Sequence, residues 1–289
     1  AFCGGINVLD DLFDPNHGNL TEPRLDFAVR VCGPLVRDVL EAMTHFWWRH
    51  QHSHEVDANE FPAAWRGQQL SLRRAARAML ARGWRANAVA GDLQDMPGTA
   101  RAGLLLRDNL RNRRKIEAAY LQAISAARSE IFVANAYFLP GARLRRALTR
   151  AARRGVKVRL LLQGRYEYFL QYHASRPVYG ALLEAGVEIY EYAASFLHAK
   201  VAVVDSVWAT VGSSNLDPLS LLMSREANVM VLDEAFAVAL KATLERAISR
   251  GGKQLDARLF GERPWLQQVK ERLAYSIMRF GLLLIGRRY

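Results

Sequence analysis

The chain has 289 residues, enough for one large domain or two domains of ordinary size. Apolar residues make up 51% and charged residues 24%, which is globular composition and excludes a disordered or collagen-like chain. Lysine and arginine outnumber aspartate and glutamate by 40 to 28, and the net charge of +12 fits a partner rich in phosphate, either anionic lipid or nucleic acid. Two cysteines, Cys3 and Cys32, are too few for a disulfide framework.

The first fifty residues repeat part of the second half of the chain. Residues 4–7 (GGIN) resemble residues 212–215 (GSSN), and residues 26–31 (DFAVRV) resemble residues 226–231 (EANVMV). A helical pattern follows each copy, and such a repeat indicates two copies of one structural unit. Aligning the copies places the counterpart of His198 before the chain begins, so we expect residues 1–50 to be the remnant of an incomplete first half.

Residues 51–111 resemble neither copy. Three alternating histidines, His50, His52 and His54, open the segment, and an arginine-rich stretch follows them. Such a run can hold a metal ion, but no cysteine or carboxylate stands at a convincing ligand spacing, and no metal site is predicted. We interpret residues 51–111 as a linker or interfacial segment.

Helix and strand patterns alternate from residue 112 onward. The predicted helices span residues 112–121, 142–154 and 179–185, and the predicted strands span residues 130–135, 156–163 and 187–192. This alternation is typical of an α/β layered unit with a mostly parallel sheet.

Three more strands complete this unit, which we expect to occupy residues 112–250. Residues 200–205 and 208–211 are separated by two residues and predict a β-hairpin. A strand over residues 227–232 precedes a helix over residues 234–248, whose apolar residues recur at helical spacing.

The final segment, residues 251–289, has no run of about 18 consecutive apolar residues, the length that spans a bilayer. Tyr275, Met278 and Phe280 stand among flanking arginines, which predicts a membrane-proximal segment lying in the interface. A C-terminal helix packed on the core is the alternative interpretation.

A histidine and a lysine mark the candidate site. His198 and Lys200 are two residues apart in a predicted strand, so their side chains point to the same face. A turn of small residues follows, with Ser213 and Asn215 as hydrogen-bond donors. This set suits a phosphate group: Lys200 and Asn215 hold its non-bridging oxygens, while the imidazole acts as nucleophile or proton donor.

Two carboxylates accompany this pair as candidate catalytic residues. Glu226 is the candidate to accept the other ring N–H of His198 and fix its tautomer. Asp205 ends the strand that follows His198, and we expect a structural role for it.

These residues resemble the second HKD motif of the phospholipase D superfamily, which reads here His198-x-Lys200-x(4)-Asp205-x(6)-Gly212-Ser213-x-Asn215. Longer stretches, above all residues 208–220 (WATVGSSNLDPLS) and residues 134–138 (ANAYF), resemble bacterial cardiolipin synthase, type B in particular. Other members of the superfamily cleave phosphodiesters in lipids or in DNA.

The resemblance implies a pseudo-twofold α/β/α sandwich in which two halves, each with one HKD motif, face a shared active site. One histidine attacks phosphorus to give a phosphohistidine, and the other protonates the leaving alcohol. His198, in the second half, would be the general acid and then the base. The family needs no metal or organic cofactor.

The resemblance also assigns roles in the first half. Gly5 and Asn7 would bind the substrate phosphate together with Ser213 and Asn215, and Asp26 would be the histidine-orienting counterpart of Glu226. No second His-x-Lys exists in the sequence, so we expect this chain alone to be inactive.

As a cardiolipin synthase-like phosphatidyltransferase, the protein would transfer a phosphatidyl group between two molecules of phosphatidylglycerol and release glycerol. Its partners would be anionic phospholipid and a peripheral membrane surface, on the cytoplasmic face of a bacterial inner membrane, and nucleic acid is not expected. Two alternatives are a nuclease or other phosphodiesterase of the same superfamily, and a non-catalytic remnant that binds anionic lipid. Phosphatidylethanolamine as donor, hydrolysis in place of transfer, and the oligomeric state stay open.

Overall fold

The structure is a computed structural model, and it describes residues 1–7, 10, 12–14, 17–54, 100–109, 112–166 and 168–284. The chain separates into two compact units. Residues 2–31 and 100–289 form the larger unit, and residue 1 with residues 32–99 forms the other. In the smaller unit the described element is helix α1, Leu35–His54. The predicted histidine run lies at the end of α1, and its side chains lie outside what is described, as does most of segment 51–111.

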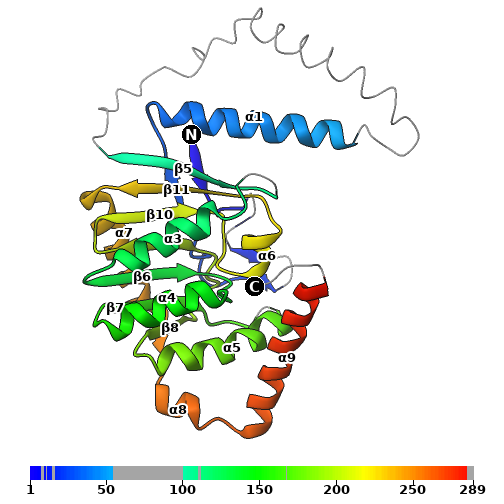
Figure 1. The fold of residues 1–289 in the computed structure, drawn as a ribbon, viewed down its shortest axis with the longest axis vertical. Coiled ribbons are helices and arrows are strands. Elements are labelled where there is room, and N and C mark those ends of the chain that lie inside the picture. The colour runs from blue at the N-terminus through cyan, green and yellow to red at the C-terminus, as the bar shows by residue number, and fades with distance from the viewer. Residues whose placement is uncertain are drawn as a thin grey trace, which may run out of the picture. The chain divides into compact units, whose positions relative to one another are not determined.

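Eight strands form one sheet in the larger unit. They are β5 (Arg101–Arg107), β6 (Glu130–Asn135), β7 (Lys157–Gln163), β8 (Glu188–Tyr192), β9 (Lys200–Val204), β10 (Trp208–Gly212), β11 (Glu226–Leu232) and β12 (Gly252–Gln254). Their order across the sheet is β12-β8-β7-β6-β9-β10-β11-β5 (Figure 1). The β6–β7 and β7–β8 pairs are parallel, and the other neighbouring pairs are antiparallel. The prediction of a mostly parallel sheet was therefore wrong, because the β9–β10 hairpin joins β6 in antiparallel register and β11 and β5 extend that pattern.

Helices cover both faces of this sheet. They are α3 (Lys115–Ala126), α4 (Ala142–Arg153), α5 (Phe169–Leu183), α6 (Pro218–Leu222), α7 (Glu234–Gly251), α8 (Ala257–Gly261) and α9 (Trp265–Leu284). One apolar core joins the sheet to α3, α4 and α5, and includes Ile116, Leu148 and Leu182. A second core joins the opposite face to α7 and includes Leu240 and Leu244. The predicted α/β/α sandwich is thus confirmed.

The N-terminal segment forms a small hairpin-like sheet on the α7 side. Its strands β1 (Phe2–Gly4) and β4 (Ala28–Arg30) are antiparallel, with Gly4 opposite Ala28. Strands β10 and β11 pair in the same way, with Gly212 opposite Asn228. The sequence repeat therefore corresponds to a repeated strand pair, and Phe27 and Val29 of the first copy pack into the core under α7. Two short strands, β2 (Phe13–Asp14) and β3 (Gly18–Asn19), pair between β1 and β4 in the sequence.

The sequence patterns located most of these elements, and the predicted β9–β10 hairpin is confirmed. Strand β5 was not predicted, because its residues fall in the arginine-rich part of segment 51–111. Helix α5 begins ten residues before the predicted start, and Pro177, which ordinarily breaks a helix, stands inside it.

The C-terminal segment contains the long helix α9, which packs beside α5 (Figure 1). Tyr275 and Met278 pack against the core and Leu282 is buried, so these residues serve core packing. Phe280, by contrast, is exposed. Among the described residues no helix combines the length and the apolar character needed to cross a bilayer.

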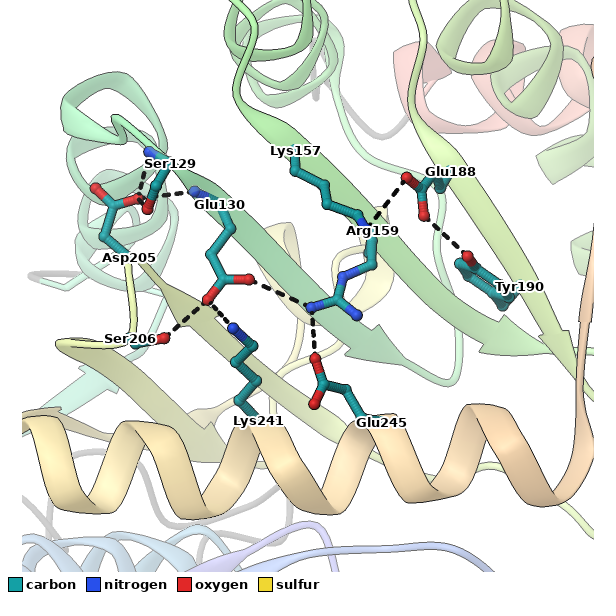
Figure 2. Close-up of polar contacts among 10 residues, drawn as sticks. All are labelled: Ser129, Glu130, Lys157, Arg159, Glu188, Tyr190, Asp205, Ser206, Lys241 and Glu245. Atoms are coloured by element: carbon teal, nitrogen blue, oxygen red, sulfur yellow. Dashed lines mark hydrogen bonds and ion pairs between the residues drawn. The ribbon is translucent and has the colours of Figure 1, made fainter.

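An ion-pair network fastens α7 to the sheet (Figure 2). Glu130 on β6 accepts hydrogen bonds from Lys241 on α7 and from Ser206. Arg159 on β7 lies 3.3 Å from Glu130 and 3.0 Å from Glu245 of α7. Burial acts to raise the pKa of Glu130, but the hydrogen bonds from Lys241 and Ser206 and the nearby positive charges lower it overall.

Replacing Glu130 with glutamine is expected to lower the free energy of unfolding by about 2–3 kcal/mol, because Arg159 and Lys241 lose their shared counter-charge in a largely buried position. Urea unfolding followed by circular dichroism measures this loss. The control is Lys157→Gln, which breaks an exposed pair with Glu188 and should cost less than about 0.5 kcal/mol. Equal losses in the two variants would contradict the proposed role of the network.

Candidate active site

The chain segment that carries His198 is pinned to the N-terminal segment. The backbone N–H of His198 donates to the carbonyl of Leu25 at 2.9 Å, and the N–H of Leu25 donates to the carbonyl of Phe196 at 2.9 Å. These bonds make a short parallel bridge between Leu25 and Leu197. The bridge places the next residue of the N-terminal segment, Asp26, beside His198.

Asp26 and His198 form a close polar contact in the site. Asp26 Oδ2 lies 2.7 Å from Nδ1 of His198, and the two side chains are 11% and 23% exposed. The other carboxylate oxygen accepts the N–H of Phe27 at 2.8 Å, which fixes the carboxylate plane. A carboxylate at Nδ1 favours the tautomer with its proton on that nitrogen, so Nε2 is left for a reacting group.

Lys200 is held against the turn of the first copy. Its side chain is buried, and Nζ donates to the carbonyl oxygen of His198. A Cβ atom on Gly5 would lie 3.0 Å from Lys200 Nζ and 3.0 Å from Asp26 Oδ1, so glycine alone permits this close approach. The ammonium group of Lys200 is therefore a second place, besides the Asp26–His198 contact, at which the two sequence copies meet.

Glu226 occupies a different part of the site from the one predicted. Its Oε2 accepts a hydrogen bond from Oγ of Ser213, and that Oγ accepts the N–H of Ala227 at 3.1 Å. Burial raises the pKa of Glu226, opposed by the hydrogen bond from Ser213 and the charge of Lys200. The carboxylate that contacts His198 is thus Asp26 of the first copy, in place of Glu226.

The sequence repeat explains why a carboxylate of the first copy contacts the histidine of the second. Asp26 stands two residues before Ala28, which lies opposite Gly4, and Glu226 stands two residues before the residue opposite Gly212. The two carboxylates are therefore equivalent positions of the two strand pairs. Because the strand pairs face one another, the carboxylate of one copy reaches the histidine of the other.

Asn215 follows β10, and two residues without a predicted role, at and just after the end of β6, hold the segment 215–216 in place. Its Oδ1 accepts the N–H of Tyr137 at 3.3 Å, and Oδ1 of Asn135 accepts the N–H of Leu216 at 3.1 Å. Asn135 is also opposite Lys200 in the β6–β9 register, so their side chains share a face. The available signal was an asparagine at the end of a strand whose central four residues are apolar. Asn7 is exposed, and its phosphate-binding role stays a prediction.

Asp205 lies at the opposite end of β9, on the order of 20 Å along the strand from His198. Its carboxylate accepts the backbone N–H groups of Arg128, Ser129 and Glu130 at 2.8–2.9 Å, as well as the hydroxyl of Ser129 (Figure 2). Burial acts to raise the pKa of Asp205, but these hydrogen bonds lower it overall. These contacts tie the turn after β9 to the start of β6, which is a structural role.

Taken together, one end of the central strands β9 and β10 presents an imidazole held at Nδ1 by Asp26, a buried ammonium group and two small-residue turns. This set matches the needs of phosphoryl transfer: a nucleophile or proton donor, a positive charge for the non-bridging oxygens, and hydrogen-bond donors around them. Within the described residues no three histidine, cysteine or carboxylate side chains cluster as a metal site.

Comparison with known proteins agrees with this chemistry. Residues 120–248 match the family model described as "Cardiolipin synthase, PLD-like domain", so this part of the chain is similar to phospholipase D-like domains. More particularly, the chain is 35% identical to Cardiolipin synthase B of Salmonella typhi and 36% identical to Cardiolipin synthase B of Escherichia coli (strain K12). Each alignment covers 99% of this chain and 62% of the relative, so the chain spans less than two thirds of their length.

A solved structure shares the fold over most of the chain. The phosphatidylserine synthase of Haemophilus influenzae Rd KW20 superimposes with a TM-score of 0.57 and 14% sequence identity. The match covers 93% of this chain and 64% of that one. The resemblance drawn from the sequence motif is confirmed for the family of the domain and for its fold.

Replacing Asp205 with asparagine is expected to lower the free energy of unfolding by about 2 kcal/mol at neutral pH, because three amide donors lose a charged acceptor. The pKa of Asp205 is lower in the folded protein than in the unfolded chain, where it is about 3.9. The stabilisation by the charged carboxylate is therefore complete above about pH 3.9 and is lost as pH falls through the folded-state pKa. Urea midpoints of the wild type and the variant should therefore converge as pH falls from 6 to about 3. A constant difference over that range would contradict the account.

Proposed function

We propose that this chain provides one histidine half of a phosphatidyltransferase site that joins two phosphatidylglycerol molecules into cardiolipin. The observation that carries the proposal is the contact between His198 and Asp26, because it orients an imidazole two residues from Lys200, whose ammonium group lies against the turn at Gly5. The similarity to two proteins named Cardiolipin synthase B supports the choice of lipid over nucleic acid.

The reaction runs in two displacements. A histidine nitrogen attacks phosphorus of the donor lipid, the bond from phosphorus to the glycerol headgroup breaks, and a second histidine gives its proton to the departing glycerol oxygen. The headgroup hydroxyl of a second phosphatidylglycerol then attacks phosphorus, and the phosphorus–nitrogen bond breaks. The second histidine takes the hydroxyl proton back, which completes the proton balance.

His198 serves as the acid and base in this scheme. Asp26 holds its ring with Nε2 toward the phosphate and stabilises the imidazolium form. Lys200 and Asn215 bind the non-bridging oxygens, and the turns at Gly5 and Ser213 supply further donors. Asn7 completes the first turn in this proposal.

The nucleophile is a second histidine from outside these 289 residues. Glu226 is the positioning residue for it, because Glu226 is the equivalent of Asp26 and its carboxylate contacts Ser213. In this proposal the chain by itself carries out no complete transfer. The substrate lies in an anionic membrane, at which the protein acts from the surface, on the cytoplasmic face of a bacterial inner membrane.

Product analysis with phosphatidylglycerol vesicles tests this proposal. A protein in which an upstream segment bearing the first motif is joined to residue 1 should form cardiolipin, and His198→Ala should reduce the rate by at least about 1,000-fold, because the proton donor is lost. His45→Ala, which removes an exposed histidine of α1, is the matched control and should keep the full rate.

Cardiolipin formation that survives His198→Ala would contradict the role of this residue. A folded extended protein that forms no cardiolipin, judged folded by circular dichroism, would contradict the proposed reaction.

A further inference from the structure

Helix α9 carries a second apolar face that the fold does not use. Its core face is formed by Ala274, Tyr275, Met278 and Leu282, which pack against the sheet-side core or are buried. A separate set of large apolar side chains on α9 is 50–70% exposed: Trp265, Leu266, Val269, Leu273, Ile277 and Phe280. We call this set the α9 stripe.

Helical geometry makes the stripe continuous. At about 100° per residue, Leu266, Val269, Leu273, Ile277 and Phe280 fall within an arc of about 80°, well separated from the core face. The outer face of a surface helix is ordinarily polar, and contiguous exposed apolar surface of this kind marks an interaction site.

Positive charges border the stripe. Arg272 and Arg279 lie on one side of it and Lys270 lies on the other, and all three residues are exposed. The one acidic residue of α9, Glu271, is buried and paired with Arg263 at 2.9 Å, so it neutralises none of the three. An apolar face with basic flanks is the pattern of a helix that lies in the interface of an anionic bilayer.

Exposed aromatic side chains extend the stripe toward the active site. Lys270 Nζ lies 4.8 Å from the ring centre of Phe169, at the start of α5, and Phe169 and its neighbour Tyr168 are exposed. The ring of Tyr168 lies 6.1 Å from that of Tyr137, whose N–H donates to Asn215. Tyrosine and tryptophan are the residues that favour the boundary between lipid headgroups and acyl chains.

We propose that the α9 stripe, with the aromatic side chains at the start of α5, is the surface that docks onto an anionic bilayer. Docking would bring the turns at Gly5 and Ser213 to the lipid headgroups. This inference rests on the proposed function for the identity of the lipid. A second copy of the chain is the poorer occupant, because a symmetric contact through this helix brings the three basic residues of one copy near those of the other.

The test is binding of the 289-residue chain to vesicles of phosphatidylglycerol, measured by co-sedimentation. Leu273→Gln/Ile277→Gln should weaken binding by roughly 10- to 100-fold, because two large side chains no longer enter the bilayer. The matched control is Val207→Gln/Val238→Gln, which makes the same kind of change at two exposed valines outside α9 and should leave binding unchanged. Melting followed by circular dichroism verifies that all variants are folded.

Two further measurements locate the contact. Brominated phosphatidylglycerol should quench the fluorescence of Trp265, so that Trp265→Phe loses the quenched fraction. Arg272→Gln/Arg279→Gln should weaken binding to phosphatidylglycerol vesicles and flatten its dependence on salt. Binding that is unaffected by the substitutions in the stripe, or quenching unchanged in Trp265→Phe, would overturn the proposal.

Other outcomes separate this inference from its premises. His198→Ala should bind vesicles as tightly as the wild type. Vesicle binding can therefore be confirmed even if the extended protein forms no cardiolipin. If the Leu273→Gln/Ile277→Gln variant changes the molecular mass in sedimentation equilibrium while vesicle binding is kept, the stripe is a contact between copies and the inference is overturned.

Discussion

A carboxylate and an imidazole that are 172 residues apart in the sequence meet at 2.7 Å, and the site depends on that contact. Asp26 holds Nδ1 of His198, and the Leu25–Leu197 bridge fixes where both residues stand. Without the N-terminal segment, the histidine would have no orienting group. The segment before β4 is therefore part of the proposed site of the second half.

The sequence repeat explains why residues of both copies contribute to the proposed site. Each copy has a strand pair with a glycine turn and a carboxylate beside it, and the two strand pairs contact one another. The backbone is closely packed at Gly5 and Gly212, because a Cβ atom would meet Lys200 and Asp26 at the first position, and Asn228 and Ala227 at the second. Meanwhile Asp205, the third member of the motif, works at the other end of β9, where it holds the turn to β6. The motif thus combines chemistry at one end of a strand with anchoring at the other.

Sequence reasoning succeeded where local patterns determine structure. Strand β6 was predicted with its exact bounds, whereas β9 begins at Lys200, so His198 lies just before the strand in which it was predicted. It failed where long-range pairing decides. Glu226 was predicted as the partner of His198, because it is a carboxylate of the same half of the chain. In the structure the two strand pairs face one another, and the partner is Asp26 of the first copy. The direction of β9 relative to β6 was missed for the same reason, since strand patterns do not reveal orientation.

The central claim is that Asp26 holds His198 in the Nδ1–H tautomer, and nitrogen-15 NMR of the histidine ring at alkaline pH tests it directly. The account predicts the Nδ1–H form for His198, its loss in Asp26→Asn, and no change of tautomer in Glu226→Gln. An Nε2–H ring in the wild type, or a tautomer that responds to Glu226→Gln and not to Asp26→Asn, would contradict the account.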